Sequence, residues 1–193
     1  MLEPRQVFRA AGYAAGAGTA GTSAAFCRRC GAALDARDAD AACAACGHRE
    51  YRNAAPAVSV LVPDGATVLL CRRAPSSFQG GRWCLPCGFV DHDEDFLTAG
   101  RREVREETGL DVEIASIISV VTNFHTPALH SLVIVLQATA VGGRLVAGDD
   151  ADAAAWFAPS DVPDLAFEAD RHIIDRWFAQ PGYGAPVDPR YAR

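Results

Sequence analysis

A dense run of charged residues between Gly88 and Leu110 constrains this chain more than any other segment. Its spacing is G-x5-E-x7-R-E-U-x-E-E-x-G-U, where U is aliphatic, with seven fixed identities and two aliphatic positions. Asp93 or Asp95 can cap the start of a helix, because a short polar side chain accepts hydrogen bonds from its first free amides. Gly109 can end that helix, because glycine takes the left-handed cap conformation without a side-chain penalty. We therefore predict a helix between these residues.

Three carboxylates share one face of the predicted helix. Glu103, Glu106 and Glu107 stand at positions i, i+3 and i+4, whereas Leu97 and Val104 line another face suited to a core. Like charges at this spacing repel by a few tenths of a kcal/mol per pair on an exposed helix. A hard divalent cation offsets the repulsion, since Mg²⁺ prefers oxygen ligands and is often shared with substrate phosphates. A solvated acidic face is the simple alternative, but it does not account for the fixed residues around the glutamates.

The complete pattern resembles the Nudix box, with no departure across its 23 positions. The resemblance implies an α/β fold, the Nudix α/β/α sandwich with a mixed sheet. It also implies a metal-dependent hydrolase acting on a nucleoside diphosphate linked to a second group. Arg102 would orient the glutamates, and Glu94 would brace the loop-to-helix turn. The implied ligands for catalytic Mg²⁺ or Mn²⁺ are Glu103, Glu106, Glu107 and the carbonyl of Gly88.

The general base has more than one candidate. Box glutamates serve as the base in some Nudix enzymes, and a loop carboxylate further along the chain serves in others. We favour Glu106, with Glu103, Arg102 and Glu107 completing the catalytic group. The residues just before Trp156 are alanines, where some relatives place a glutamate. The alternatives are Asp149, Asp150 and Asp152, with Glu168 behind them.

A second motif precedes the box. The pairs Cys27/Cys30 and Cys43/Cys46, each followed by glycine, have the spacing C-x2-C-x12-C-x2-C. Each pair makes a tight knuckle, and two knuckles complete a closed tetrahedral thiolate site for structural Zn²⁺. Two disulfides are the alternative, but they need an oxidising compartment, and the total of seven cysteines is odd. A closed zinc site has no open coordination position, and a segment this short depends on its metal to fold.

The chain divides into four parts on this reading. Residues 1–25 are rich in glycine and alanine, and we expect a flexible N-terminal segment, although a helix through 4–15 is conceivable. Residues 26–53 form the zinc ribbon and residues 54–180 the Nudix hydrolase domain. Residues 181–193 form an irregular C-terminal tail.

Alternation and apolar runs predict the other elements of the main domain. Strands are expected at 57–63, 67–73, 111–122, 131–140 and 153–158, and a last helix at 168–180. The turn Asp64-Gly65 joins the first two strands, and Gly142-Gly143 marks a hairpin. Residues 123–130 are predicted as a loop bordering the substrate. The candidate substrate contacts are Arg72, Arg73, Phe124 and His125, with a solvated strand end or a surface loop as the alternatives.

Charge and hydropathy limit the partners. The net charge is −6, and residues 26–53 carry five arginines against four acidic residues, which disfavours binding to nucleic acid. No apolar run approaches the roughly 18–20 residues of a membrane span, and no secretion signal is visible. We therefore expect a cytoplasmic protein without a membrane partner. Homodimers are common in the resembled family, and we expect one here.

The order of zinc ribbon and Nudix domain resembles the NADH pyrophosphatase group and its shorter relatives. That group carries a Ser-Gln-Pro-Trp-Pro-Phe-Pro stretch after the box, which this chain lacks. The segment from Trp156 to Phe167 resembles ribbon-bearing proteins that act on ADP-ribose or flavin dinucleotides. We therefore expect hydrolysis of an ADP-ribose, NADH or FAD-like pyrophosphate. The alternatives are a house-cleaning nucleoside triphosphate pyrophosphatase and a nucleotide-sensing regulator without activity.

Overall fold

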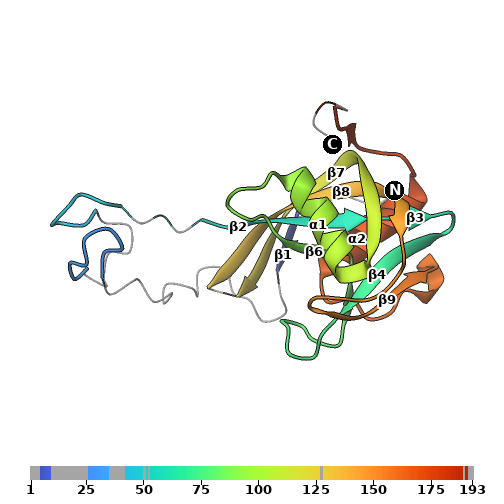
Figure 1. The fold of residues 1–193 in the computed structure, drawn as a ribbon, viewed down its shortest axis with the longest axis horizontal. Coiled ribbons are helices and arrows are strands. Elements are labelled where there is room, and N and C mark those ends of the chain that lie inside the picture. Colours follow the sequence, from blue (N-terminus) through green and yellow to red (C-terminus); the bar gives the residue numbers. More distant parts are fainter. Residues whose placement is uncertain are drawn as a thin grey trace.

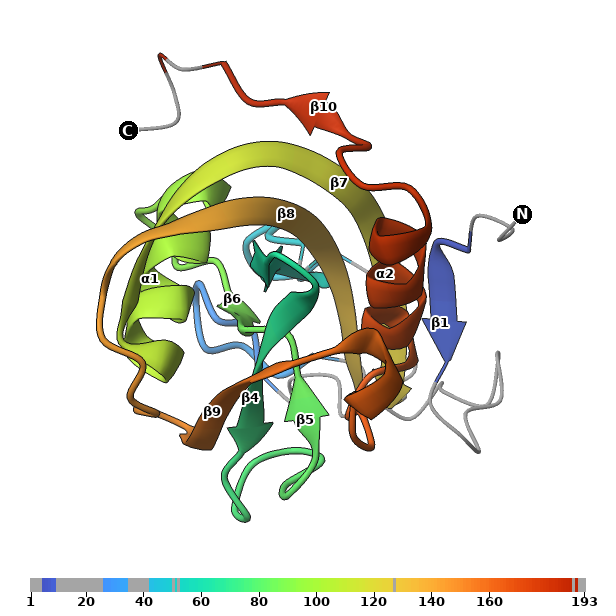
Figure 2. The same ribbon diagram turned by 90° about the vertical axis from the view of Figure 1, so that its right-hand side faces the viewer.

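Two helices enclose two β-sheets in the computed structural model, which describes residues 5–9, 26–34, 42–49, 51, 53–126, 128–188 and 190 (Figure 1). α1 (Phe96–Thr108) and α2 (Glu168–Ala179) lie on opposite sides of the sheets (Figure 2). The α/β sandwich implied by the resemblance is therefore confirmed. The strands are β1 (Val7–Arg9), β2 (Ala55–Leu61), β3 (Pro63–Asp64), β4 (Thr67–Arg73), β5 (Trp83–Cys84), β6 (Cys87–Phe89), β7 (Leu110–Thr126), β8 (Leu129–Gly143), β9 (Ala151–Phe157) and β10 (Ala185–Pro186).

The larger sheet is mixed and is centred on β8 and β2. Its strand order is β1-β7-β8-β2-β6, with β10 added to β7. β2 runs parallel to β8 and antiparallel to β6. The side chains from Val58 to Leu61 are all buried, because both faces of β2 are covered. The smaller sheet has the order β3-β4-β5, with β9 also paired to β4.

Each helix closes its own apolar core. Ile173 and Trp177 of α2 pack into one cluster, and Leu97 and Val104 of α1 pack into the other. Successive side chains of β2 point to opposite faces, so Val60 joins the cluster under α1 while Leu61 joins the cluster under α2. The central strand therefore ties the two cores together.

Both ends of α1 are capped as the sequence indicates. The side chain of Asp95 accepts hydrogen bonds from the first free amides of the helix, and Gly109 ends it with φ at 72°. The segment 144–148 then donates backbone amides to the carbonyls of Glu107, Thr108 and Gly109. These bonds satisfy carbonyls that the helix itself leaves free. The box helix is thus fixed by the chain that follows β8.

The strand predicted at 57–63 is divided between the two sheets. β2 ends at Leu61 and pairs with β8 and β6, whereas Pro63 and Asp64 form β3 beside β4. The carbonyl of Val62 accepts a hydrogen bond from the amide of Leu69, so the chain passes from one sheet to the other at this point. The turn at Asp64-Gly65 is present, but it joins β3 to β4.

The loop predicted at 123–130 is the tip of a long antiparallel hairpin instead. β7 runs to Thr126 and β8 begins at Leu129, so Phe124 and His130 are cross-strand partners. Their rings meet edge to face with centroids 4.7 Å apart. The hydroxyl of Thr126 accepts two backbone amides within the turn. Cross-strand ring packing therefore outweighs the turn-like local composition.

Gly142 and Gly143 do not form the predicted hairpin. They end β8 opposite Asp111 and Leu110, and the chain then crosses to β9 in the smaller sheet. The crossing is needed because β9 pairs with β4 and has no partner in the larger sheet.

The N-terminal segment contains a strand where a helix was conceivable. β1 pairs in parallel with β7, and Phe8 is buried in the core under α2. The flexible segment was expected at residues 1–25, of which residues 1–4 and 10–25 lie outside the described residues. The tail expected to be irregular contains the short strand β10. Within the described part of the chain, no helix has the length and apolar character that crossing a membrane requires.

Replacing Gly109 by alanine should destabilise the protein more than the same change at Gly65. Both glycines have positive φ, which costs an L-residue about 1–2 kcal/mol. A Cβ at Gly109 would lie 2.5 Å from the carbonyl oxygen of Arg144, whereas a Cβ at Gly65 meets nothing within 4 Å. We expect a loss in unfolding free energy of about 1 kcal/mol for Gly65→Ala and roughly 3 kcal/mol for Gly109→Ala, measured by urea denaturation. Equal losses would contradict the tight packing of 144–148 on the helix end.

Candidate active site

Arg102 holds the box loop and the box helix together. Its guanidinium donates to both carboxylate oxygens of Glu94, at 2.5 and 3.1 Å, and to the carbonyl of Phe89 at 3.0 Å. It also donates to Glu103 at 2.7 Å and to Glu106 at 3.0 Å. These hydrogen bonds lower the pKa of Glu94 and raise the pKa of Arg102. One arginine therefore neutralises carboxylates from the loop and from two positions on α1.

The three box glutamates lie at different depths. Glu107 is 1% exposed and Glu103 is 7% exposed, whereas the side chain of Glu106 is 44% exposed. The carboxylate of Glu107 accepts from the thiol of Cys71 and from the amide of Cys87, both at 3.1 Å. Burial raises the pKa of Glu107 to about 8 and also raises the pKa of Glu103. The helix thus carries carboxylates that the fold keeps away from water.

Gly88 lies directly against one of these carboxylates. A Cβ built on Gly88 would overlap both the carboxylate carbon and the oxygens of Glu103. A glycine at this position therefore leaves room for the Glu103 carboxylate beside the backbone of β6. Carboxylates and a nearby carbonyl are the donor set that Mg²⁺ and Mn²⁺ take in proteins, so Glu103 and Gly88 fit such an ion by their chemistry. The three box carboxylates do not all lie within 4.8 Å of one another in this structure.

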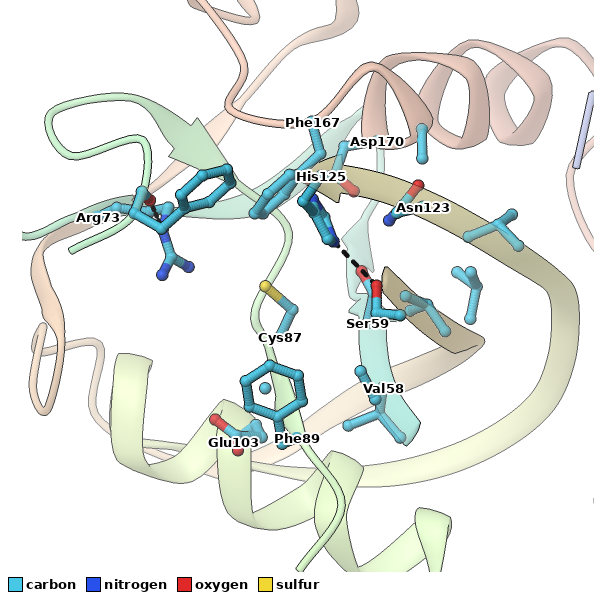
Figure 3. Close-up of a pocket in the computed structure, with 18 of the residues that line it drawn as sticks. Val58, Ser59, Arg73, Cys87, Phe89, Glu103, Asn123, His125, Phe167 and Asp170 are labelled. Atoms are coloured by element: carbon cyan, nitrogen blue, oxygen red, sulfur yellow. Dashed lines mark hydrogen bonds between the residues drawn. The ribbon is translucent and has the colours of Figure 1, made fainter. Parts of the chain in front are cut away.

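A cavity of about 300 Å³ opens beside the box. Figure 3 shows Glu103 and Phe89 at one side of it and His125, Asn123 and Asp170 at the other. Its wall follows alternate residues of the long strands, because every second side chain of a strand faces the same way. These are Val121, Asn123 and His125 of β7 and Leu129, Ser131, Val133 and Val135 of β8. The cavity therefore connects the box carboxylate to a chamber between the sheet and α2.

Aromatic and polar groups meet in that chamber. The His125 ring lies edge to face with Phe78 and with Phe167, at centroid distances of 5.6 and 5.7 Å. Its Nε2 shares a hydrogen bond with the hydroxyl of Ser131 at 2.9 Å, and burial lowers the pKa of His125. Asp170 accepts from the amide of Leu85 at 3.1 Å, and burial raises the pKa of Asp170 to about 7. Apolar pockets with a few convergent polar groups are the usual form of a small-molecule site.

The structure brings only some of the candidate substrate contacts to this cavity. Arg73 and His125 line it. Arg72 instead pairs with Asp152 at 2.6 Å and lies over Trp83. Phe124 lines an adjoining hollow of about 290 Å³. Successive side chains of a strand point to opposite faces, so Arg73 and His125 face the cavity while their neighbours Arg72 and Phe124 do not.

The loop carboxylates also separate into two groups. Asp149 and Asp150 line the cavity, and Asp149 has a left-handed backbone with φ at 51°. Asp150 accepts from Arg73 at 3.2 Å. Asp152 and Glu168 form ion pairs with Arg72 and Arg5 and do not line this cavity. Asp149 and Asp150 are therefore the loop residues closest to the box site.

Several residues of the site were missed in the sequence. Ser59, Ser131, Asn123 and Asp170 are buried and line the cavity. A signal existed for two of them. Ser59 interrupts an apolar strand, and Asp170 stands three and four residues before buried isoleucines on the apolar stripe of α2. Burying a polar residue in an otherwise apolar face costs free energy unless it has a hydrogen-bond partner, so such a residue indicates a site where a partner or ligand is present.

The four ribbon cysteines form a separate cluster, and the segments 26–34 and 42–49 that carry them lie at the left of Figure 1. Their sulfur atoms all lie within 4.8 Å of one another, and among the described residues no other three histidine, cysteine, aspartate or glutamate side chains come together in this way. Two pairs, Cys27/Cys46 and Cys30/Cys43, have sulfurs 3.7 Å apart. A tetrahedral site with zinc–sulfur bonds of about 2.3 Å has edges of about 3.8 Å. The cluster therefore has the size of a tetrathiolate metal site and not of disulfides.

Both knuckles have the same backbone design. Gly31 donates to the carbonyl of Cys27 and Gly47 to that of Cys43, each at 2.8 Å. Both glycines have φ near 70°. This positive φ is why each C-x2-C pair is followed by glycine, since other residues adopt it at a cost.

The sequence is similar to those of known Nudix proteins. The NUDIX domain family matches residues 50–178, which is more than half of the chain. An ADP-ribose pyrophosphatase of Methanocaldococcus jannaschii is 36% identical over 133 residues, covering 67% of this chain and 78% of that protein. A NAD-capped RNA hydrolase NudC of Pseudomonas aeruginosa is 34% identical over 147 residues, covering 74% of this chain. The chain spans about half, 51%, of the length of that NudC protein.

A solved structure gives the same result at the level of the fold. The crystal structure of a NUDIX hydrolase from Nitrosomonas europaea has a TM-score of 0.69 and 25% sequence identity, and the match covers 83% of this chain and 94% of that one. The chain therefore belongs to the Nudix hydrolase family.

Removing the buried charge of Glu107 should change how stability depends on pH. The folded pKa of about 8 lies above the ordinary value of 4.5, so the folded state binds more protons between these values and stability falls as pH rises through them. With a chelator present, we expect Glu107→Gln to gain roughly 2–4 kcal/mol of unfolding free energy over the wild type between pH 5 and pH 9. Urea denaturation at both pH values measures this change. Glu113→Gln, an exposed position on β7, is the control, and parallel pH profiles for Glu107→Gln and wild type would contradict the burial.

Proposed function

We propose that this chain hydrolyses the pyrophosphate bond of a nucleoside diphosphate derivative of the ADP-ribose, NADH or FAD class. The products would be a nucleoside monophosphate and a second phosphorylated molecule. The observation that carries the proposal is one cavity that joins a box carboxylate to an aromatic and polar chamber. The similarity to the M. jannaschii ADP-ribose pyrophosphatase supports the choice of substrate.

Glu103, Glu106, Glu107 and the carbonyl of Gly88 would hold catalytic Mg²⁺ or Mn²⁺. A bound divalent ion neutralises phosphate charge and lowers the pKa of water. The chain's own residues then set where the reaction takes place. Arg102 keeps Glu103 and Glu106 on one side of the helix, and Arg73 places a positive charge on the wall facing the box. A substrate phosphate beside Arg73 in the cavity would meet a charge of the opposite sign.

Glu106 is the proposed general base. Its side chain is the exposed member of the three, so it can exchange protons with solvent while Glu103 and Glu107 remain buried. A positioned base contributes typically 10²–10⁴-fold to such a reaction. Asp149 is the second candidate, because it lines the same cavity as Glu103.

The partners follow from the same proposal. The substrate is a nucleotide-derived small molecule, and the expected homodimer remains a prediction. The expectation that nucleic acid is not bound also remains a prediction. Because the P. aeruginosa relative is named as a NAD-capped RNA hydrolase, capped RNA belongs in the substrate tests. The nucleoside triphosphates belong there as the alternative class.

The purified protein should release AMP from ADP-ribose in the presence of Mg²⁺ or Mn²⁺ and lose this activity in a chelator. The panel is ADP-ribose, NADH, NAD, FAD, diadenosine polyphosphates, NAD-capped RNA and nucleoside triphosphates, with products separated by chromatography. We expect Glu106→Gln to lower kcat by about 10²-fold or more, whereas Glu113→Gln keeps wild-type activity. Silence across the panel, with ADP-ribose still raising the melting temperature, would favour the sensing regulator.

We also propose that Cys27, Cys30, Cys43 and Cys46 hold one structural Zn²⁺. The protein should then carry about one zinc per chain by elemental analysis. Cys43→Ser should lose the metal, because removing one of four thiolates opens the site. Cys84→Ser is the matched control, since Cys84 is a buried thiol outside the cluster. Zinc retained at full stoichiometry in Cys43→Ser would contradict the assignment.

A further inference from the structure

Three cysteines outside the ribbon meet beside the box helix. Cys71 on β4 and Cys84 on β5 are cross-strand partners, and their sulfur atoms lie 3.9 Å apart. Cys87 on β6 follows Cys84 with the spacing C-x2-C, and the interaction with the Cys84 thiol is the main cause that raises the pKa of Cys87. The three thiols are therefore neighbours in a row, with Cys84 in the middle.

This cysteine cluster contacts two of the box carboxylates. The thiol of Cys71 and the backbone amide of Cys87 both donate to Oε2 of Glu107, each at 3.1 Å. Cys87 also precedes Gly88, whose backbone lies so close to the Glu103 carboxylate that no Cβ would fit between them. A displacement of Cys87 would therefore disturb the surroundings of both Glu103 and Glu107.

Of these three thiols, Cys87 is the one that faces the substrate cavity. Cys71 and Cys84 are 1% and 0% exposed, so a reagent in solvent does not reach them directly. Cys87 is half-buried and lines the cavity, and Figure 3 shows it between Phe89 and His125. A small reagent that enters the cavity therefore meets Cys87 first, and the thiol next to Cys87 is that of Cys84.

We propose that Cys84 and Cys87 are a modification site, where hydrogen peroxide that enters the cavity converts the two thiols into a reversible disulfide. A thiol that only fills space in a core needs no path to solvent, whereas Cys87 has one through the cavity. The disulfide itself does not depend on the proposed function. Its effect on metal binding rests on the metal site that the proposed function includes.

The reaction balances with one hydrogen peroxide and the two thiols. The Cys87 sulfur attacks a peroxide oxygen, the O–O bond breaks, and the products are a sulfenic acid on Cys87 and water. The Cys84 sulfur then attacks the Cys87 sulfur, the S–O bond breaks, and the oxygen leaves with the thiol proton as a second water. The two sulfurs are oxidised and the peroxide is reduced, and a dithiol reductant reverses the disulfide by exchange.

The disulfide should weaken the box metal site. The two sulfur atoms must come within about 2.05 Å of each other, which draws Cys87 toward Cys84 and moves its amide relative to Glu107. The loss of groups that orient metal ligands typically lowers metal affinity by about 10–100-fold. We therefore expect the oxidised protein to bind Mn²⁺ about 10–100-fold more weakly than the reduced protein, as measured by calorimetry.

Peptide mapping detects the disulfide without reference to activity. The chain has no lysine, so trypsin cuts only after arginine, and it leaves Cys84 and Cys87 together in peptide 83–101 and Cys71 in peptide 53–72. The full chain is treated with hydrogen peroxide at pH 8.5, where more of each thiol is ionised than at pH 7, and free thiols are then alkylated. We expect peptide 83–101 to lose two hydrogens and to regain them in dithiothreitol. The ribbon cysteines lie in other tryptic peptides.

Single substitutions separate this pair from the third thiol and from the ribbon. Cys71→Ser should still form the disulfide, whereas Cys84→Ser and Cys87→Ala should not. Cys84→Ser keeps all four ribbon cysteines, so it controls for damage to the ribbon by peroxide, and its Mn²⁺ affinity should be the same before and after treatment. Each variant is compared with its own untreated form, so a general loss of stability does not imitate the result.

A treated wild type whose peptide 83–101 contains no disulfide would overturn the inference. A cross-link between peptides 53–72 and 83–101 would also overturn it, because Cys71 would then be the partner. A mapped disulfide with unchanged Mn²⁺ affinity would refute its effect on the box. Untreated protein that neither binds Mn²⁺ nor hydrolyses ADP-ribose would refute the proposed function, and the peptide map would still decide whether Cys84 and Cys87 are the modification site.

Discussion

Two carboxylates, Glu103 and Glu107, are buried one helical turn apart on α1, and much of the site follows from this constraint. Burial disfavours the charged form of each group, and their charges disfavour one another. Nearby groups offset this cost. Arg102 pairs with Glu103, and the amide of Cys87 and the thiol of Cys71 donate hydrogen bonds to Glu107. A protein built only for stability would place apolar residues here, since buried ionisable groups rarely add to stability.

The segment after β8 connects this helix to the rest of the cavity. Its amides at 144–148 donate to the carbonyls at the end of α1, and the amide of Gly148 donates to the backbone carbonyl of Glu107. The next residues, Asp149 and Asp150, line the cavity, and Asp150 pairs with Arg73 at the end of β4. The segment 144–150 therefore caps the helix and also brings the carboxylates of Asp149 and Asp150, just before β9, to the cavity. A shift of this segment would move both.

The sequence was most informative where the structure is local. The caps at Asp95 and Gly109, the spacing of the glutamates and the cysteine knuckles all depend on residues a few positions apart. The hairpin at Phe124 and His130 was missed because its pairing is decided across strands. The end of β2 at Leu61 was missed because a single apolar run, residues 57–63, continues from the larger sheet into the smaller one.

The site was predictable only at the box end. The approach of Gly88 to Glu103 follows from a short loop-to-helix motif, whereas the chamber at Asn123 and Asp170 exists only once β7 and α2 are packed together. Period-two patterns show that two residues share a face, but not what that face opposes. The hydrogen-bonding needs of Ser59 and Asp170 were the remaining signal, and they become specific only in three dimensions.

The most direct measurement is the number of protons released when Mn²⁺ binds at pH 7. Because burial holds the pKa of Glu107 near 8, this carboxyl is mainly protonated before the ion binds, and a ligand must lose its proton. Calorimetry in buffers with different ionisation enthalpies should give about one proton per Mn²⁺ for the wild type and nearly none for Glu107→Gln. Equal proton release from both proteins, or no binding of Mn²⁺, would contradict a metal site built on the buried box carboxylates.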